Sequence, residues 1–336
     1  MRMSRNERET LIHILLSASL NRAVCTVAEL GIADHIVPGV PQTAEYLAKV
    51  TGTHHRSLYR LLRFLASYGL FSETHEGRFD HSALSYLLRS DAEGSLQPAA
   101  RMAHRLFPAW DGLHHAVQTG ETGLKKVFGE SLFDYLKTRP EDAAIFDAGM
   151  SAIHGSETDA MLDAYAFENV KILADIGGGN GSLLGAVLKR YPTLRGVLFE
   201  LDHVAQRAQQ FLRSSGVMDR CTIAAGDFFE SIPGGADLYL MRHVLHDWSD
   251  EQALLILKNC RDAMPQDGRL LIVECVVPAG NDASLAKDFD MAMLVFPGGM
   301  ERTEREYAEL LQRSGFRLSG ITSTASMISV LEARAQ

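Results

Sequence analysis

A glycine-rich turn that directly follows a short apolar run constrains the fold of this chain more than any other feature. Residues 175–181 read Asp-Ile-Gly-Gly-Gly-Asn-Gly and close the β-rich run 172–176. Glycines at such a place let the backbone approach a ligand closely and turn tightly into a helix. Position 182 is Ser, so the G-x-G-x-x-G spacing of dinucleotide folds is missing, and no Lys-Ser or Lys-Thr pair makes a P-loop. The pattern, led by Asp175, favours a ligand without a pyrophosphate; a turn that binds nothing is the alternative.

Further acidic residues stand where later strands should end. Glu200 closes the second β-rich run and is placed to hold both ribose hydroxyls of a nucleoside, a role for which Asp202 competes. Asp227 follows the third run and could accept a hydrogen bond from an adenine amino group, with Phe228 packed on the ring. Because the carboxyl ends of parallel strands line the ligand crevice of an open α/β sheet, these residues together predict one nucleoside site.

The spacing of apolar residues divides the chain into regions of different structure. Up to about residue 165 they recur every three or four residues, which predicts helices; beyond it β-rich runs alternate with helices, which predicts a parallel sheet. We expect a winged-helix-like domain over 1–100, a helical linker over 101–164 and a Rossmann-like α/β domain over 165–336. The expected strands are 172–176, 196–201, 222–225, 236–241 and 269–275, with two more β-rich runs within 317–331. The expected helices of this domain are 182–191, 251–264 and 303–314.

The first hundred residues have the outline of a winged helix. Two helices are expected, over 43–50 and 54–68, followed by a small hairpin that turns at Glu76-Gly77. Three arginines share one stripe of the second helix, so DNA binding must be weighed: Arg56, Arg60 and Arg63. Residues 1–100 contain ten Lys or Arg and ten Asp or Glu, and the whole chain has a formal net charge of −9. A nucleic-acid-binding domain usually shows a basic excess, so we expect packing or dimerisation here instead.

Neither a membrane span nor a disulfide framework is expected. The run 11–20 is apolar, but Glu7 and Glu9 precede it and His13 interrupts it, so an amphipathic helix is favoured over a signal segment. No uninterrupted apolar run is long enough to span a bilayer, and we expect a cytoplasmic protein. The four cysteines are scattered and include no C-x-x-C pair: Cys25, Cys221, Cys260 and Cys275. We expect them to be free thiols without a functional role.

A histidine-containing segment follows the fourth β-rich run. Residues 242–250 read Arg-His-Val-Leu-His-Asp-Trp-Ser-Asp, and Ser249 is expected to cap the next helix. His243 and His246 could bind a metal, but no third ligand with suitable spacing follows, so no metal is expected. Histidines whose hydrogen bonds are satisfied within the structure are the other interpretation.

Four motifs in this order resemble the class I S-adenosylmethionine-dependent O-methyltransferases, which include plant caffeate- and flavonoid-type enzymes and bacterial enzymes of antibiotic and pigment biosynthesis. They are residues 175–181, Gly226-Asp227-Phe228, His246-Asp247-Trp248 and residues 297–303, Pro-Gly-Gly-Met-Glu-Arg-Thr. The resemblance covers nearly the whole chain and implies a homodimer built through the winged-helix part. It also implies O-methylation of a small aromatic or polyketide-like secondary metabolite, with S-adenosylmethionine converted to S-adenosylhomocysteine and neither nucleic acid nor membrane as a partner.

The resemblance implies a role for particular residues. His246 matches the catalytic base, and Glu274 and Glu301 match the two acids that flank and orient it. Cofactor ligands are implied at Asp175, Gly177, Gly179, Glu200, Asp227, Phe228 and Arg242. Acceptor contacts are implied at Phe146, Met150, Asp247, Met291 and Phe296, so that the linker region shares in the acceptor pocket.

This chain departs from the plant enzymes at three of these positions. Glu200 stands where the family usually has Asp, and Arg242 stands where the plant enzymes commonly have Lys. Phe296 replaces a polar Asn that is common in the phenylpropanoid enzymes, so their particular substrates are not implied for this chain.

A histidine base suits a phenolic or enolic hydroxyl better than an aliphatic alcohol. A phenol has a pKa of about 10 and a histidine about 6.5, so full proton transfer is uphill by roughly 5 kcal/mol. A carboxylate such as Glu301 or Glu274 raises the basicity of the imidazole, and the sulfonium of the cofactor favours the developing phenolate. Two other functions stay open: non-methylating chemistry with the bound cofactor (cyclisation, hydroxylation or decarboxylation), and a winged-helix regulator that senses a small ligand.

Overall fold

The computed structural model describes residues 5–74 and 77–336, which fold into two compact units. The first unit holds the chain up to Pro108 together with Asp134–Gly155. The second unit holds Ala109–Phe133 together with Ser156–Gln336. Residues of the expected linker, 101–164, are thus distributed over both units.

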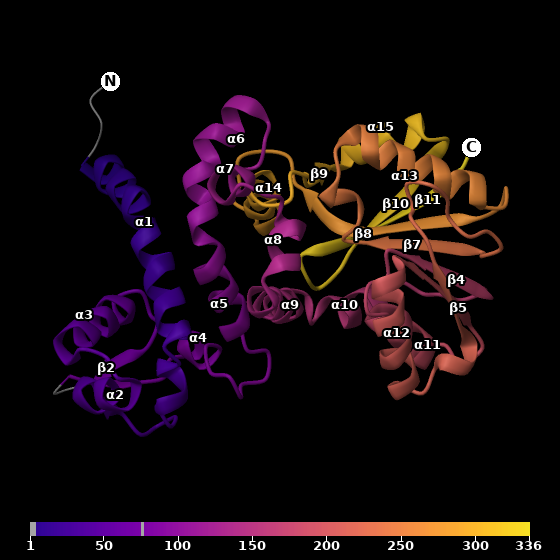
Figure 1. The fold of residues 1–336 in the computed structure, drawn as a ribbon. Coiled ribbons are helices and arrows are strands. Elements are labelled where there is room, and N and C mark those ends of the chain that lie inside the picture. Colours follow the sequence, from indigo (N-terminus) through magenta and orange to yellow (C-terminus); the bar gives the residue numbers. More distant parts are fainter. Residues whose placement is uncertain (1–4, 75–76) are drawn as a thin grey trace. The chain divides into compact units, whose positions relative to one another are not determined.

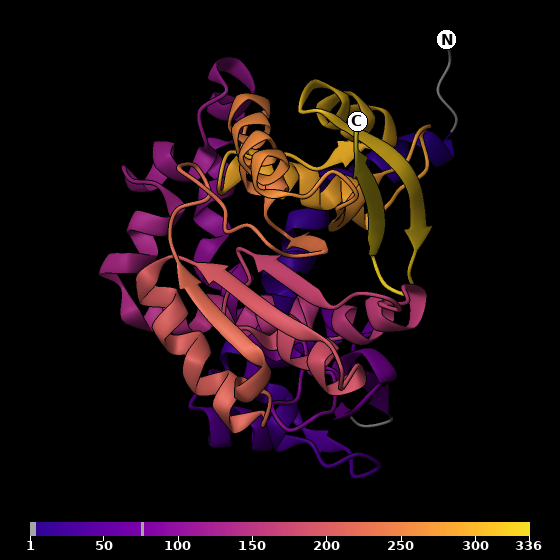
Figure 2. The ribbon, with the colours of Figure 1, turned by 90° about the vertical axis from the view of Figure 1, so that its right-hand side faces the viewer.

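A mostly parallel sheet of eight strands forms the centre of the second unit (Figures 1 and 2). Its strands are β4 (Ile172–Ile176), β5 (Arg195–Glu200), β6 (Cys221–Ala225), β7 (Leu238–Arg242), β8 (Arg269–Val277), β9 (Arg302–Thr303), β10 (Phe316–Ser323) and β11 (Ile328–Ala335). The order is β10-β11-β8-β7-β4-β5-β6, with β9 paired to β8 outside this row. Strands β4 to β9 pair in parallel, whereas the hairpin β10–β11 joins β8 antiparallel. The predicted Rossmann-like α/β fold is confirmed.

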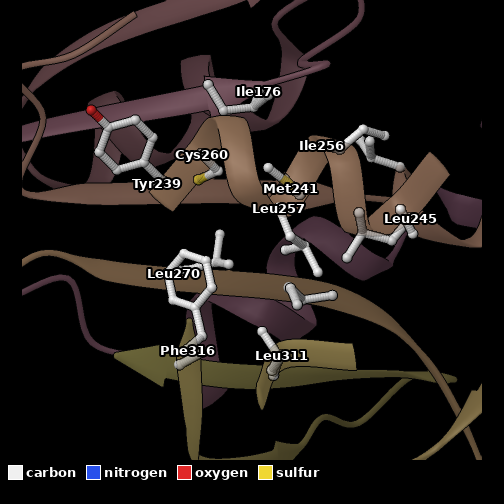
Figure 3. Close-up of a cluster of buried hydrophobic side chains, with 14 of the residues drawn as sticks. Ile176, Tyr239, Met241, Leu245, Ile256, Leu257, Cys260, Leu270, Leu311 and Phe316 are labelled. Atoms are coloured by element: carbon white, nitrogen blue, oxygen red, sulfur yellow. The ribbon is translucent and has the colours of Figure 1, made fainter. Parts of the chain in front are cut away.

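Helices cover both faces of this sheet, with a buried apolar cluster on each side. Figure 1 shows α13 (Asp250–Ala263) and α15 (Glu304–Arg313) over one face, and α11 (Ser182–Arg190) and α12 (Asp202–Ser214) over the other. Strand β7 alternates between the two clusters: Tyr239 and Met241 join the first and Leu238 and Leu240 the second. This is the period-2 pattern of a strand that is buried on both faces. Figure 3 shows the first cluster between β7, α13 and the start of β10.

Residues 109–133 pack within the second unit. The short helix η2 (Phe107–Gly112) leads into α6 (Leu113–Thr119) and α7 (Gly123–Phe128), and both α6 and α7 contact α14 (Leu285–Val295). A Cβ atom at Gly112 would overlap the backbone of Gly123, so only glycine lets the two segments come this close. The start of α7 also lies against the chain that follows α14, since a Cβ atom at Gly298 would lie 2.9 Å from the Cγ2 of Thr122.

The first unit begins with α1 (Arg5–Glu29) and contains the helices and hairpin expected for a winged helix. Its other elements are η1 (Ile32–His35), β1 (Gln42–Thr43), α2 (Ala44–Thr51), α3 (His55–Ala66), β2 (Ser72–Thr74), β3 (Arg78–Asp80), α4 (Ala83–Tyr86), α5 (Gln97–Leu106) and α9 (Pro140–His154), with α8 (Leu132–Thr138) at its boundary. Strand β1 pairs with β3, which gives a three-stranded sheet of order β1-β3-β2. The leucine stripe of α3 is core, whereas Arg56, Arg60 and Arg63 are exposed. Glu76, at the expected hairpin turn, lies outside the described residues.

Helix α1 carries an exposed apolar face. Five of its side chains are 43–71% exposed: Leu11, Ile12, Ile14, Leu15 and Leu16. Within the described part of the chain, α1 is also the one helix that is long and apolar enough to cross a membrane, over Asn6–Glu29. Asn21 and Arg22 lie inside this stretch, so it is not an uninterrupted apolar run. The core helix of a soluble protein and a signal sequence pass the same test of length and composition.

Candidate active site

The glycine turn after β4 lies at the carboxyl end of the sheet and is open on one side. Gly177, Gly179 and Gly181 have φ angles of 69°, 56° and 78°, a region that strains residues with a side chain. A Cβ atom at Gly177 would lie 2.9 Å from the Cγ2 of Val244, whereas at Gly179 it would meet nothing within 4 Å. The turn is therefore packed on its inner side and open at Gly179, where a ligand can approach the backbone.

Glu200 bonds to the glycine turn and Asp175 lies behind it. Glu200 Oε2 accepts from the Gly179 N–H at 3.1 Å, and Oε1 accepts from the Leu201 N–H at 2.8 Å. Its competitor Asp202 instead accepts a hydrogen bond from Gln206 along the exposed start of α12. Asp175 is buried and, among the described residues, its Oδ2 has no hydrogen-bond partner. Burial raises the pKa of Asp175 to about 7, against the opposing charge of Arg242. Asp175 thus lies against the inner side of the turn, where a Cβ atom at Gly178 would be 2.7 Å from its carboxyl group.

An aromatic cluster lies beside Asp227, after β6. The ring of Phe229 lies 4.9 Å from that of Phe228 and 4.8 Å from that of Trp248, centroid to centroid. Asp227 Oδ1 accepts from the Phe229 N–H, and Asn259 on α13 donates to the carbonyls of Phe228 and Phe229. Sequence reasoning did not assign Phe229, Trp248 or Asn259 to this site. Phe229 and Trp248 stand next to assigned motif residues in the sequence, and this position could have identified them. No sequence feature points to Asn259.

Arg242 and His243 connect the end of β7 to α10 (Glu157–Ala164). Arg242 Nη1 donates to the Thr158 hydroxyl at 2.8 Å. His243 has a φ of 53°, and its Nε2 lies 2.7 Å from Oε2 of the fully buried Glu157. The His243 ring lies 5.1 Å from that of His246. His243 thus belongs to a partly buried polar network beside His246, and the expectation of no metal stays a prediction.

His246 is buried in the short turn η4 (Leu245–Asp247), and carboxylates surround its imidazole. Its Nδ1 lies 2.8 Å from Glu301 Oε1, and its Nε2 lies 3.6 Å from Asp247 Oδ1. Burial alone would lower the pKa of His246, but the Glu301 hydrogen bond and the charges of Glu274 and Asp247 outweigh it and raise the pKa to about 9. Burial also raises the pKa of Asp247 to about 6. The imidazole is therefore a strong base oriented by Glu301.

Glu274, on β8, reaches the backbone of the His246 turn. Its Oε1 accepts from the N–H groups of Val244, Leu245 and His246 at 3.1, 2.7 and 3.3 Å. Its Oε2 accepts from the hydroxyl of Tyr307 on α15. Among the described contacts, none is a hydrogen bond between Glu274 and the imidazole. Of the two acids expected to flank His246, Glu301 contacts the imidazole and Glu274 holds the turn that carries it.

The chain that follows α14 lies directly against the His246 turn. The Met300 N–H donates to the His246 carbonyl at 2.8 Å, and a Cβ atom at Gly299 would overlap that carbonyl oxygen. Phe296 lies four residues earlier, and its ring meets that of Trp110 edge to face at 5.7 Å. Met291, on α14, is 37% exposed. The edge-to-face pair of Phe296 and Trp110 is thus an aromatic wall within the second unit, four residues along the chain from the Met300 contact with the His246 turn.

Two of the expected acceptor residues lie in the other unit. Phe146 and Met150 are partly buried on α9 of the first unit, whereas Met291 and Phe296 belong to the second. That the four share one pocket stays a prediction. Trp110 was not among the acceptor residues expected from the sequence, because no motif contains it.

Comparison with known proteins gives matches over nearly the whole chain. A sequence model of the O-methyltransferase domain matches residues 110–317, and one of the O-methyltransferase dimerisation domain matches residues 12–91. Phenazine O-methyltransferase PhzM of Lysobacter antibioticus is 42% identical over 96% of this chain and 95% of its own. Mitomycin biosynthesis 6-O-methyltransferase of Streptomyces lavendulae is 39% identical over 97% of this chain and 94% of its own.

A solved structure also matches nearly the whole chain. The O-methyltransferase NcsB1 from neocarzinostatin biosynthesis, in complex with S-adenosylmethionine and 2-hydroxy-5-methyl naphthoic acid, superposes with a TM-score of 0.81. Its identity to this chain is 31%, over 94% of this chain and 96% of that one. The chain belongs to the S-adenosylmethionine-dependent O-methyltransferases and carries their dimerisation domain ahead of the catalytic domain.

Proposed function

We propose that this enzyme transfers the methyl group of S-adenosylmethionine to a phenolic or enolic hydroxyl of an aromatic or polyketide-like secondary metabolite, with His246 as general base. The observation that carries the proposal is the buried bond between His246 Nδ1 and Glu301. It fixes the tautomer that leaves Nε2 as the acceptor. Asp247, whose Oδ1 lies 3.6 Å from Nε2, would lie beside the bound acceptor and favour the imidazolium that forms when Nε2 takes the hydroxyl proton.

The raised pKa of His246 reduces the difference between its pKa and that of a phenol, and this difference limits proton transfer. A free histidine lies about 3.5 pKa units below a phenol of pKa about 10. With its pKa at about 9, His246 lies only about one unit below, a difference of roughly 1.4 kcal/mol. An aliphatic alcohol would still be far too weak an acid for this base. A bound sulfonium, being cationic, favours the neutral imidazole and the phenolate together.

The glycine turn and its neighbours are assigned to the cofactor. Gly177 and Gly179 would hold the methionine end, Glu200 the ribose hydroxyls, and Asp227 with Phe228 the adenine. The open space at Gly179 and the half-buried aromatic cluster at Phe228 support this assignment. Arg242 would supply positive charge near the cofactor carboxylate. Asp175 would lie behind the turn without contacting the cofactor directly, since it is buried beneath Gly178.

The acceptor pocket is assigned to planar aromatic molecules. Met291, Phe296 and Trp110 offer apolar and aromatic surface, which favours stacking over hydrogen bonding. Phe146 and Met150, on α9 of the first unit, are proposed as further acceptor contacts, as the family resemblance implies. Relatives named for phenazine and mitomycin, and the naphthoic acid bound to NcsB1, support polycyclic phenols as the acceptor class.

The first unit is assigned to a homodimer interface. The dimerisation model matches residues 12–91, and the five exposed apolar side chains of α1 would be covered by a second copy. We propose winged-helix-like dimerisation over 1–100, a linker and acceptor region over 101–164 and a catalytic domain over 165–336. We further propose that the dimer is cytoplasmic and binds neither nucleic acid nor membrane.

Calorimetry with S-adenosylmethionine and S-adenosylhomocysteine tests the cofactor assignment. Gly179→Arg should abolish the binding that the wild type shows, because the arginine fills the open side of the turn. Gly216→Arg is the matched control, since Gly216 also has a positive φ and open space around it. Absence of binding to the wild type would refute the assignment. A panel of phenolic and naphthoic acids, scored by product mass, then identifies an acceptor.

A further inference from the structure

Three side chains of one short segment, residues 301–307, hold the His246 turn, two by direct contact and one through Glu274. Glu301 bonds to the imidazole, as described above. Arg302 bonds to carbonyl groups of the turn, and Tyr307 bonds to the carboxylate that holds its amide groups. The three side chains come from the end of the Pro-Gly-Gly-Met-Glu-Arg-Thr motif, from β9 and from the first turns of α15. The segment thus holds both the base and the backbone beneath it.

Tyr307 acts on the amide side of the turn through Glu274. Both side chains have no exposed surface. Glu274 divides its two oxygens, Oε1 to three backbone N–H groups and Oε2 to the Tyr307 hydroxyl. Buried carboxylate oxygens need hydrogen-bond donors, because an unpaired one loses the hydration it had in water. The Tyr307 hydroxyl is the side-chain donor among them.

Arg302 acts on the carbonyl side of the same turn. It is 1% exposed, and its Nη1 donates to the Leu245 carbonyl at 3.0 Å. Its Nη2 donates to the Trp248 carbonyl at 2.9 Å, and Nε and Nη2 both bond to Asp250. Leu245, next to His246, is therefore held at its N–H by Glu274 and at its carbonyl by Arg302. Its side chain lies in the buried cluster of Figure 3.

We propose that Tyr307 and Arg302 are positioning residues of the methyl transfer. Tyr307 would act through Glu274 and Arg302 through the carbonyls of Leu245 and Trp248. The two would fix the place of the His246 ring and, through the charge of Glu274, its basicity. The inference rests on the proposed role of His246 as base.

Loss of the Tyr307 hydroxyl should change the titration of His246. The charged or titratable groups that face His246 are Glu301, Glu274, Asp247 and His243. Without this donor, Glu274 Oε2 would be left unpaired in the core and the side chain would shift, so that its negative charge would lie further from a protonated His246. The pKa of His246 should then fall. A purely structural tyrosine would leave that pKa unchanged.

The first experiment compares Tyr307→Phe with Tyr239→Phe. Tyr239 is equally buried, and its hydroxyl bonds to the carbonyls of Pro233 and Ala263 at 3.1 Å, away from the turn. NMR of ¹³C-histidine-labelled enzyme with S-adenosylhomocysteine reports the His246 pKa without an acceptor, with His246→Asn to assign the signal. We expect Tyr307→Phe to lower this pKa and to reduce kcat about tenfold, since small displacements of a base are costly. Values equal to those of Tyr239→Phe would overturn the role of Tyr307.

The second experiment compares Arg302→Lys with Arg220→Lys. Arg220 also donates to three backbone carbonyls, those of Leu188, Tyr191 and Leu194, but it lies at the other end of the sheet from His246. A lysine cannot bridge carbonyls as a guanidinium does. Arg302→Lys should lower kcat about 100-fold with unchanged S-adenosylhomocysteine binding, as a base displaced by about 1 Å would. A kcat equal to that of Arg220→Lys would overturn the role of Arg302.

His246→Ala separates failure of this inference from failure of the proposed function. Turnover is measured with the phenolic acid of the panel that the wild type methylates fastest. If His246→Ala is inactive while Tyr307→Phe and Arg302→Lys behave as their controls, the positioning roles alone are wrong. If His246→Ala keeps wild-type turnover, the base assignment itself is wrong.

Discussion

The Nδ1 atom of His246 lies 2.8 Å from Oε1 of Glu301, and both side chains are buried. Glu301 is 55 residues further along the chain, on the segment between α14 and β9. The two meet because the Met300 N–H bonds to the His246 carbonyl and Arg302 bonds to the carbonyl of Leu245. The base and the acid that orients it are thus held by backbone contacts on both sides of the pair.

Glu301→Gln should move the pH profile of catalysis toward acid. The Glu301 hydrogen bond and charge raise the His246 pKa, so their loss lowers that pKa from about 9 toward its ordinary range. The acid limb of kcat/KM should shift to lower pH, while kcat at high pH falls about 10- to 100-fold because the base is weaker and less well oriented. Glu309→Gln, on the exposed side of α15, serves as the control. An unshifted acid limb would contradict the pairing.

Gly299→Ala should damage catalysis through the backbone. A Cβ atom at this position would overlap the His246 carbonyl oxygen and lie 2.8 Å from the Asp247 Cα. The turn must move, so we expect about 100-fold lower kcat and a loss of unfolding free energy of about 1–3 kcal/mol. Gly320→Ala, with nothing within 4 Å of its Cβ position, is the matched control. Wild-type turnover in Gly299→Ala would show that the turn has room to adjust.

Phe296→Asn should weaken binding of apolar aromatic acceptors. The edge-to-face contact with Trp110 is lost, and pairs of this kind contribute about 0.5–1.5 kcal/mol beyond buried area. We expect KM for a naphthoic acid to rise several-fold, with kcat changed little. Trp110→Ala should act in the same direction, and the double variant should cost less than the sum of the two. Strictly additive losses would mean that the two rings do not form one wall.

Asp175→Asn should change how stability depends on pH. Burial raises the folded-state pKa of Asp175 to about 7, so its contribution to stability is full below about pH 4 and is lost as the pH rises through 7. Asparagine does not ionise. The free energy of unfolding of Asp175→Asn, relative to wild type, should therefore increase between pH 5 and pH 8. Urea titrations of both proteins, with the exposed Asp202→Asn as control, measure it. A difference that does not vary with pH would contradict the buried carboxyl.

Local pattern predicted much of the catalytic unit, because its strands and helices alternate with clear turn signals. The first strand and the helix after the glycine turn lie where the apolar run and the Ser182 start place them. The sequence predicts Ser249 as a helix cap because this hydroxyl residue directly precedes the helix. Its side chain accepts a hydrogen bond from the Gln252 N–H. Such features depend on neighbours in sequence.

The contacts that complete the site depend on neighbours in space. The hydrogen bond between Tyr307 and Glu274 joins residues that are 33 positions apart, and the sequence around neither residue predicts it. The same holds for Trp110 against Phe296, which meet because residues 109–133 pack on α14 rather than with the rest of the expected linker. Glu274 was expected beside the imidazole because an acid in that order of motifs suggests it, whereas its strand position aims it at the backbone amides.

Methyl transfer through His246 is tested most directly with S-adenosylmethionine that carries a CD3 group on sulfur and with the acceptor of the panel that the wild type methylates fastest. We expect the wild type to form a product in which one CD3 group replaces the hydroxyl hydrogen. His246→Ala should form almost none of it, while both proteins bind S-adenosylhomocysteine equally. A product without the label, or labelled product formed as fast by His246→Ala, would contradict methyl transfer through this base.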